Sequence, residues 1–471
     1  MKDKKIFLKA CCIFFAFLTL NVSLYGQEAY RIELDVRGMD KEPVILGTFY
    51  GESTYVSDTS NYEDGVHVFS GSEPLPRGMY FIARDSRRLL DLVVNEDQKF
   101  RLSTDTSDYI MNLVVTGDTD NQLFLEDMKF NAMRNQEAAP FLSVLRDSTA
   151  SPEARASAQA GLNAINDAVR AHQEDVIREH PNSFMAKIYR AQRRERLPEA
   201  EAEQNPERAF RYYKEHYWDN FDLSDPVMLR LNQPMFKDKL ETYFDNLVVH
   251  QSDSIIAEMD RLAKVASENE DTYKYFVWYL TIKYREPRIM GLDEIFVHMN
   301  DAYFASGEMD YWANAQLRKN IQDYADRLRN SLIGKKAPEM IMQDENMEKK
   351  SLYDIDSKYT IIYFFDPDCH HCKLATPVLN DLYDSDKFDM EVFAVSTDTS
   401  MVKMKDYIRD MGLSWVTVNG PRTFTRPYYE LYDALTTPTF YILDADKTII
   451  AKKLPVDRIE EFLTRYEEGK K

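Results

Sequence analysis

The chain has 471 residues, and 79 acidic against 59 basic residues give it a formal net charge of −20. This acidity argues against a nucleic-acid partner, because a protein that binds a phosphate backbone needs a basic face. Hydrophobic residues make up 44% of the chain and aromatic residues 13%, enough for sizeable cores, so global disorder is excluded. At roughly 150 residues per domain, the length predicts about three domains.

Residues 1–26 have the three-part pattern of a secretory signal peptide. Four lysines precede an apolar run at Ala10–Leu20, and the small residues Ser23 and Gly26 follow it. A membrane anchor is the alternative, but the run has about 11 residues and a span needs about 20. We therefore expect cleavage, no membrane span afterwards, and export to the periplasm or cell envelope of a Gram-negative-type bacterium.

Residues 27–119 show the period-two pattern of β-strands. Tyr30–Val36 alternates apolar and polar residues as a half-buried strand should. Further segments repeat the pattern between turn signals, at Val44–Tyr50, Val66–Ser70, Met79–Ala83, Leu89–Val94 and Phe100–Ser103. Short strands at this spacing predict an antiparallel β-sandwich.

Residues 120–332 show the period of helices. Apolar residues recur on one helical face, as at Ile255, Met259, Leu262 and Ala266. We expect an all-α region whose biochemical role the sequence leaves open. Its aromatic segment Phe210–Trp218 is interpreted as helix packing, with a partner-binding surface as the alternative.

Residues 333–471 alternate strands and helices, which predicts an α/β layer around a central sheet. Tyr359–Phe365 is an apolar run typical of a strand buried on both faces. Further strands are expected at 388–395, 413–418, 439–443 and 448–451, with helices beginning near Cys369 and Met401 and a closing helix at 456–466.

Two cysteines remain once the expected signal peptide is removed, Cys369 and Cys372. A protein stabilised by disulfides would show several well-spaced cysteines, whereas a single C-x-x-C pair indicates redox chemistry. Thiol–disulfide exchange needs a thiolate attacker, and a helix start supplies unpaired N–H groups and the positive dipole end. We therefore expect Cys369 to be the nucleophile and Cys372, one turn along, to be the resolving thiol.

The segment Phe365–Pro377 resembles a thioredoxin active site, and Thr436–Phe440 resembles the cis-proline loop of that family. The leader Gly334–Pro338 and an insertion within 400–418 are similar to the TlpA/ResA branch of exported thiol–disulfide oxidoreductases. The resemblance covers about residues 333–471.

The resemblance implies a thioredoxin fold in which Thr437 and cis Pro438 present a backbone edge to a peptide substrate. It also implies protein thiol or disulfide substrates, an upstream redox partner, and no cofactor. Two positions depart from the family pattern. Tyr363 stands where thioredoxins bury an acid, and Ala375 stands where ResA-like proteins have a glutamate. Because both acids help to move protons, their absence bears on the rate and direction of exchange.

His370 and His371 separate the two cysteines. A donating imidazole would stabilise the thiolate and raise the reduction potential above the about −270 mV of thioredoxin, into a range of roughly −240 to −170 mV. The alternative is two solvated imidazoles with little effect. A metal site is not expected, because four consecutive residues cannot easily converge on one ion. Haem attachment through C-x-x-C-H fails, because Lys373 occupies the last place.

Taken together, these features predict an exported thiol–disulfide oxidoreductase. One alternative is a non-catalytic envelope binding protein with a structural or vestigial disulfide. Another is a metal or haem chaperone for cytochrome assembly that uses the same dithiol.

Overall fold

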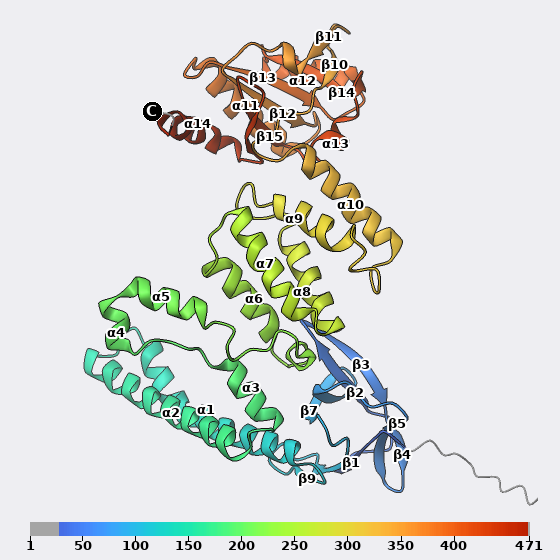
Figure 1. Cartoon of the computed structure of the whole chain (residues 1–471), viewed down its shortest axis with the longest axis vertical. Coiled ribbons are helices and arrows are strands. Elements are labelled where there is room, and N and C mark those ends of the chain that lie inside the picture. The colour runs from blue at the N-terminus through green and yellow to red at the C-terminus, as the bar shows by residue number, and fades with distance from the viewer. Residues whose placement is uncertain (1–27, 470–471) are drawn as a thin grey trace, which may run out of the picture. The chain divides into compact units, whose positions relative to one another are not determined.

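The computed structural model describes residues 28–469, so the predicted signal peptide lies outside the described residues. The chain divides into two compact units (Figure 1). One comprises the described residues up to Phe49 together with Thr54–Ile188, and the other comprises Tyr50–Ser53 and the chain from Tyr189 onward. Within the part of the chain that is described, no helix is both long enough and apolar enough to cross a membrane.

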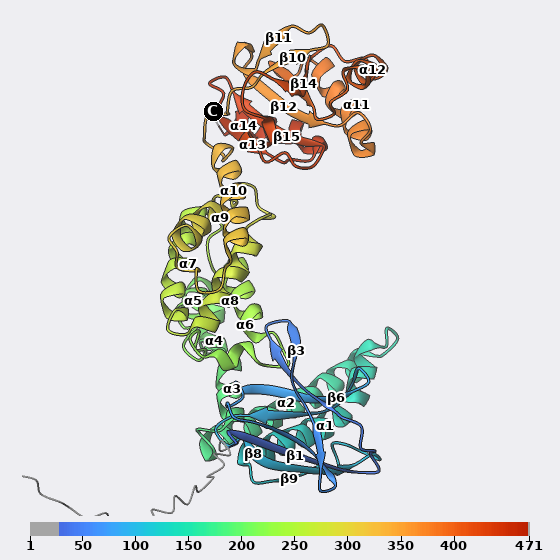
Figure 2. The ribbon, with the colours of Figure 1, turned by 90° about the vertical axis from the view of Figure 1, so that its right-hand side faces the viewer.

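The N-terminal residues form two β-sheets that bury a shared core (Figure 2). The strands are β1 (Tyr30–Arg37), β2 (Ile45–Tyr50), β3 (Ser53–Thr59), β4 (Asn61–Glu63), β5 (Val66–Gly71), β6 (Gly78–Arg84), β7 (Arg87–Val94), β8 (Lys99–Asp105) and β9 (Val114–Thr116). One sheet has the order β4-β5-β1-β8-β9 and the other β3-β2-β6-β7. The predicted sheets are confirmed, with one departure from the antiparallel pattern. The strands β1 and β8 pair in parallel, where the chain has returned to the first sheet after β7.

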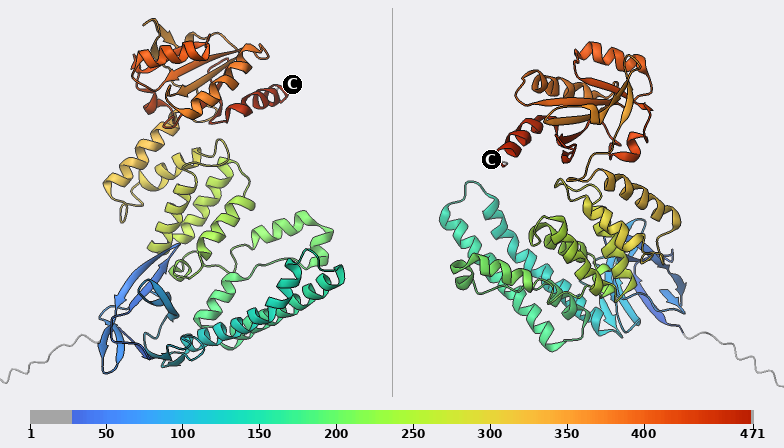
Figure 3. Two further views of the ribbon diagram at one scale, coloured as in Figure 1. Left: turned by 180° about the vertical axis from the view of Figure 1, so that it is seen from behind. Right: turned by 45° about the horizontal axis from the view of Figure 1, so that its top comes forward.

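The helical middle region begins with two long helices, α1 (Thr119–Arg146) and α2 (Pro152–Glu179), which form an antiparallel hairpin (Figure 3). The later helices are α3 (Phe184–Gln192), α4 (Glu199–Gln204), α5 (Pro206–Glu215), α6 (Met235–Asn246), α7 (Ser252–Ala266), α8 (Glu270–Lys283), α9 (Glu294–Met299) and α10 (Ala315–Asn330). The predicted apolar stripe of α7 is buried along its whole length. The helical prediction is therefore confirmed.

The C-terminal residues form a seven-stranded sheet of order β11-β10-β14-β13-β12-β15-β16. Its strands are β10 (Ile341–Asp344), β11 (Lys349–Ser351), β12 (Tyr359–Phe365), β13 (Met390–Ser396), β14 (Val416–Thr423), β15 (Thr439–Asp444) and β16 (Ile449–Lys452). Its helices are α11 (His370–Asp384), α12 (Met401–Met411), α13 (Tyr428–Leu431) and α14 (Ile459–Glu468). The inner strand β12, between β13 and β15, is buried at every residue, with alternate side chains in the cores on opposite faces of the sheet. This confirms the predicted α/β layer.

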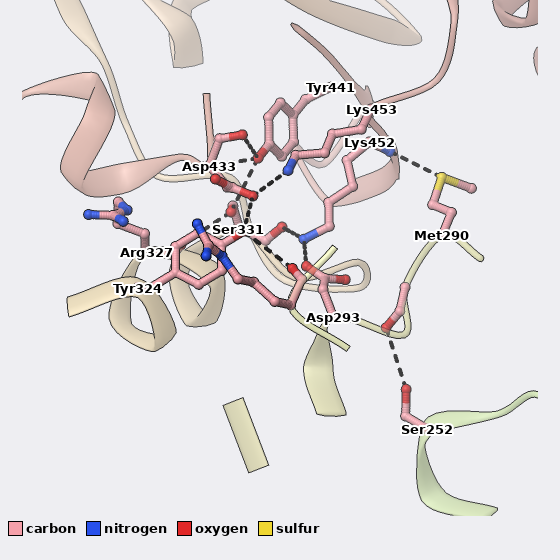
Figure 4. Close-up of polar contacts among 12 residues, drawn as sticks. Ser252, Met290, Asp293, Tyr324, Arg327, Ser331, Asp433, Tyr441, Lys452 and Lys453 are labelled. Carbon is pink, nitrogen blue, oxygen red and sulfur yellow. Dashed lines mark hydrogen bonds and ion pairs between the residues drawn. The ribbon is translucent and has the colours of Figure 1, made fainter. Parts of the chain in front are cut away.

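A buried ion pair joins this sheet to the helical region of the same unit (Figure 4). The ammonium of Lys452 at the end of β16 pairs with the carboxylate of Asp293 and donates to the carbonyl of Ser331 at 2.9 Å. Both charged side chains are almost inaccessible, at 4% and 7%. Burial lowers the pKa of Lys452. The cost of desolvating its ammonium is therefore larger than the stabilisation that the ammonium gains from the carboxylate of Asp293.

Removing the charge of Asp293 should destabilise this unit strongly. In Asp293→Asn the ammonium of Lys452 would stay buried without its counter-ion, which typically costs roughly 3–5 kcal/mol. The matched control is Asp301→Asn, whose partner Arg329 and own side chain are about half exposed. An exposed pair of this kind contributes roughly 0–1 kcal/mol. Urea denaturation measures the unfolding free energy that each variant loses. Equal losses would contradict the strong dependence of this unit on Asp293.

Candidate active site

Cys369 lies at the start of α11, directly beyond the carboxyl end of β12. It is the N-cap residue of the helix, and its sulfur accepts a hydrogen bond from the backbone N–H of Cys372 at 3.3 Å. The turn before it is held by the N–H of Cys369, which donates to the carbonyl of Asp366 at 3.0 Å. The N-terminal N–H groups of a helix have no partner within the helix, so a sulfur in this position receives them.

The loop before β15 lies against the same sulfur. The Thr437–Pro438 peptide bond is cis, and the thiol of Cys369 donates to the carbonyl of Thr437 at 3.5 Å. Both cysteines are free thiols; Cys369 is half-buried and Cys372 is fully buried. An incoming sulfur can therefore reach Cys369 but not Cys372.

The two thiols differ in acidity. Burial alone would raise the pKa of the Cys369 thiol, but hydrogen bonds from Cys372 and from the backbone N–H of His371 outweigh it and hold the pKa below its ordinary value. Burial raises the pKa of Cys372 to about 11. The accessible sulfur is thus also the one that ionises first.

The imidazoles of His370 and His371 are both exposed, with ring centroids 5.9 Å apart. His371 acts on Cys369 through its backbone N–H. The predicted role of the imidazoles in setting the potential therefore stays a prediction.

A buried chain of hydroxyl groups lies beneath the dithiol, where thioredoxins carry an acid. The Tyr363 hydroxyl lies 2.7 Å from that of Thr376, which lies 2.6 Å from that of Tyr407. Tyr363 also donates to the carbonyl of Cys372 at 3.4 Å, and burial raises its pKa well above the ordinary value. Sequence reasoning identified Tyr363 but missed Thr376 and Tyr407. The one available signal was that Thr376 lies one helical turn beyond Cys372.

Three carboxylates, from Asp366, Asp368 and Asp398, lie close together beside the start of α11. The ammonium of Lys403 bonds to Asp368 at 2.7 Å and to Asp398 at 3.1 Å. A cation of the protein itself therefore already pairs with two of the three carboxylates, and the group is an ion-pair cluster.

Comparisons with known proteins show what this part of the chain is similar to. Residues 333–452 match the model of the AhpC/TSA family. They form a thioredoxin-like domain. The thiol–disulfide oxidoreductase ResA of Bacillus cereus is 24% identical over 149 residues, which cover 31% of this chain and 84% of that protein. ResA of Bacillus anthracis is 25% identical over 136 residues, covering 28% of this chain and 76% of that protein. The thioredoxin-like domain is thus similar in sequence to thiol–disulfide oxidoreductases.

Two solved structures are similar to parts of this chain, and a second family model matches its helical middle region. A thioredoxin-like protein from Bacteroides caccae has a TM-score of 0.46 at 18% identity, covering 58% of this chain and 97% of that one. A domain of a possible thiol-disulfide isomerase from Cytophaga hutchinsonii has a TM-score of 0.27 at 34% identity, covering 29% and 95%. Residues 132–326 match a domain of unknown function, DUF5106.

Alkylation of the reduced protein should modify Cys369 faster than Cys372 throughout pH 6 to 8. One pKa unit changes the thiolate fraction about tenfold, so we expect the two rates to differ by at least about tenfold. Lowering the pH should slow the alkylation of Cys372 in proportion to its falling thiolate fraction, and should slow the alkylation of Cys369 less. Peptide mapping by mass spectrometry measures both rates, and the control is the urea-unfolded chain, where they should converge. Faster modification of Cys372 at pH 6 would reverse the assigned roles.

Proposed function

We propose that this chain is an exported thiol–disulfide oxidoreductase that acts on protein thiols or disulfides through Cys369 and Cys372. The observation that carries the proposal is the asymmetry of the pair. Cys369 is accessible, receives the helix N–H groups and has a lowered pKa, whereas Cys372 is buried with a raised pKa. A structural disulfide would need neither feature. The similarity to ResA supports the same reading.

In the reductive direction the Cys369 thiolate attacks one sulfur of a substrate disulfide. The substrate S–S bond breaks, one substrate sulfur leaves as a thiolate and takes up a proton, and a mixed disulfide forms. Cys372 then loses its proton and attacks the sulfur of Cys369, which releases the second substrate thiol. Two electrons have passed to the substrate and the enzyme holds a disulfide. An upstream dithiol partner restores the reduced state, and the reverse sequence oxidises a substrate.

The loop at Thr437 and Pro438 would hold the substrate backbone during this exchange. The Thr437 carbonyl lies within hydrogen-bonding distance of the Cys369 sulfur, so a peptide that pairs with this edge would bring its own sulfur to the nucleophile. No cofactor takes part in the proposed reaction.

Turnover and trapping test the proposal together. The wild-type protein should accelerate reduction of the insulin disulfides by dithiothreitol, and Cys369→Ser should abolish that acceleration. Once reduced and freed of dithiothreitol, Cys372→Ser should instead accumulate a mixed disulfide between Cys369 and insulin, visible on non-reducing gels and lost on adding reductant. A wild-type protein that accelerates insulin reduction no more than Cys369→Ser, with neither faster than dithiothreitol alone, would reject the proposal and favour a binding protein.

The reduction potential should depend on the two histidines if their imidazoles stabilise the thiolate. We expect a wild-type value above the about −270 mV of thioredoxin, because stabilising the dithiol by about 1.4 kcal/mol raises a two-electron potential by about 30 mV. The variant His370→Ala/His371→Ala should then fall toward the thioredoxin value in glutathione redox buffers. An unchanged potential in that variant would mean that the backbone N–H groups, and not the imidazoles, set the reduction potential of the cysteine pair.

A further inference from the structure

A cleft of about 780 Å³ opens beside the dithiol, and two parts of the chain line it. One wall comes from the thioredoxin-like domain and includes His371, Leu374 and Pro438. The facing wall is the segment Arg285–Gly291, which connects α8 to α9 in the helical region of the same unit. The helical region therefore contributes directly to a cleft that reaches the first turn of α11 at His371.

Hydrogen bonds hold the Arg285–Gly291 segment at both ends (Figure 4). The hydroxyl of Tyr324 donates to the carbonyl of Arg285 at 3.3 Å. The sulfur of Met290 accepts from the backbone N–H of Lys452 at 3.3 Å. The hydroxyl of Ser252 donates to the carbonyl of Gly291 at 3.4 Å. Since the buried Asp293–Lys452 pair follows directly, the segment is a wall anchored to the sheet edge.

The cleft presents apolar side chains on both walls. Ile289 and Met290 on one wall are 41% and 37% exposed, and Leu374 and Leu435 on the other are each 59% exposed. Exposed apolar side chains gathered in a concave site mark a binding surface more than single scattered ones do.

The charged side chains that line the cleft are balanced in sign, with Arg285, Arg288, Lys452 and Lys453 against Glu286, Asp293, Asp433 and Asp457. Lys453 pairs with Asp433, and Lys452 pairs with Asp293. The guanidinium of Arg285 lies over the ring of Tyr324, 5.4 Å from its centroid. The walls therefore offer no strong charge of one sign to select an acidic or basic partner.

We propose that this cleft binds an extended segment of the substrate protein that carries an apolar residue next to its reactive cysteine, with Arg285–Gly291 as the selecting wall. The inference rests on the proposed function and names its substrate class. A concave site bounded by two walls suits a single extended strand better than the flat surface of a folded protein. The volume of the cleft falls in the roughly 300–1,000 Å³ range of sites that enclose a drug-sized ligand. Thr437 aligns the backbone, and the walls select the neighbouring side chain.

The test uses the full-length protein and two short peptides that differ only beside their single cysteine, leucine in one and serine in the other. Each peptide carries a chromogenic thiol in disulfide linkage, and its release reports attack by Cys369. The wild type should react roughly tenfold faster with the leucine peptide, the lower end of what an apolar pocket discriminates. Ile289→Ser and Leu435→Ser, one from each wall, should each reduce that ratio severalfold.

Val402→Ser is the matched control, because Val402 is 68% exposed on α12 and lies outside the cleft. It should keep the wild-type ratio, and thermal melting shows whether each variant is folded. A wild-type ratio near one, or a ratio unchanged in Ile289→Ser, would overturn the inference. If wild-type Cys369 fails to react even with oxidised glutathione, the proposed function itself is rejected and the inference falls with it.

Discussion

The chemistry of this protein depends on one constraint: the first turn of α11 must begin at Cys369. Only there do the unpaired backbone N–H groups point at a sulfur, and a helix that started one residue later would lose the bond from Cys372. The placement follows from β12, whose seven buried residues anchor the strand and deliver the turn at its carboxyl end. The sheet thus determines where the sulfur lies, and the helix determines how acidic it is.

The replacement of a buried acid by Tyr363 follows from the same core. Tyr363 is fully buried and stacks on Phe440 with ring centroids 4.8 Å apart. A carboxylate there would pay a large desolvation cost, whereas a neutral hydroxyl needs only hydrogen-bond partners. Thr376 and Tyr407 supply them. The site therefore keeps a polar group beneath the dithiol without keeping a charge.

Much of this could be predicted from the sequence, because the decisive signals are local. The C-x-x-C pair, the apolar run of β12 and the stripe of α7 each lie within one element. The edge strands β3 and β4 were missed since their side chains are almost all exposed and carry no alternation. The parallel pairing of β1 with β8 and the cleft wall at Arg285–Gly291 depend on contacts between distant segments. No pattern within one segment encodes the Asp293–Lys452 pair that positions that wall.

Titration of thiolate absorbance in the ultraviolet tests the central claim most directly, with Cys369→Ser subtracted to remove the tyrosine background. We predict that the difference curve gives Cys369 a pKa below the reference of about 8.5 for a free thiol. A difference curve with its midpoint at or above the reference would contradict the claim that the start of α11 prepares Cys369 for exchange.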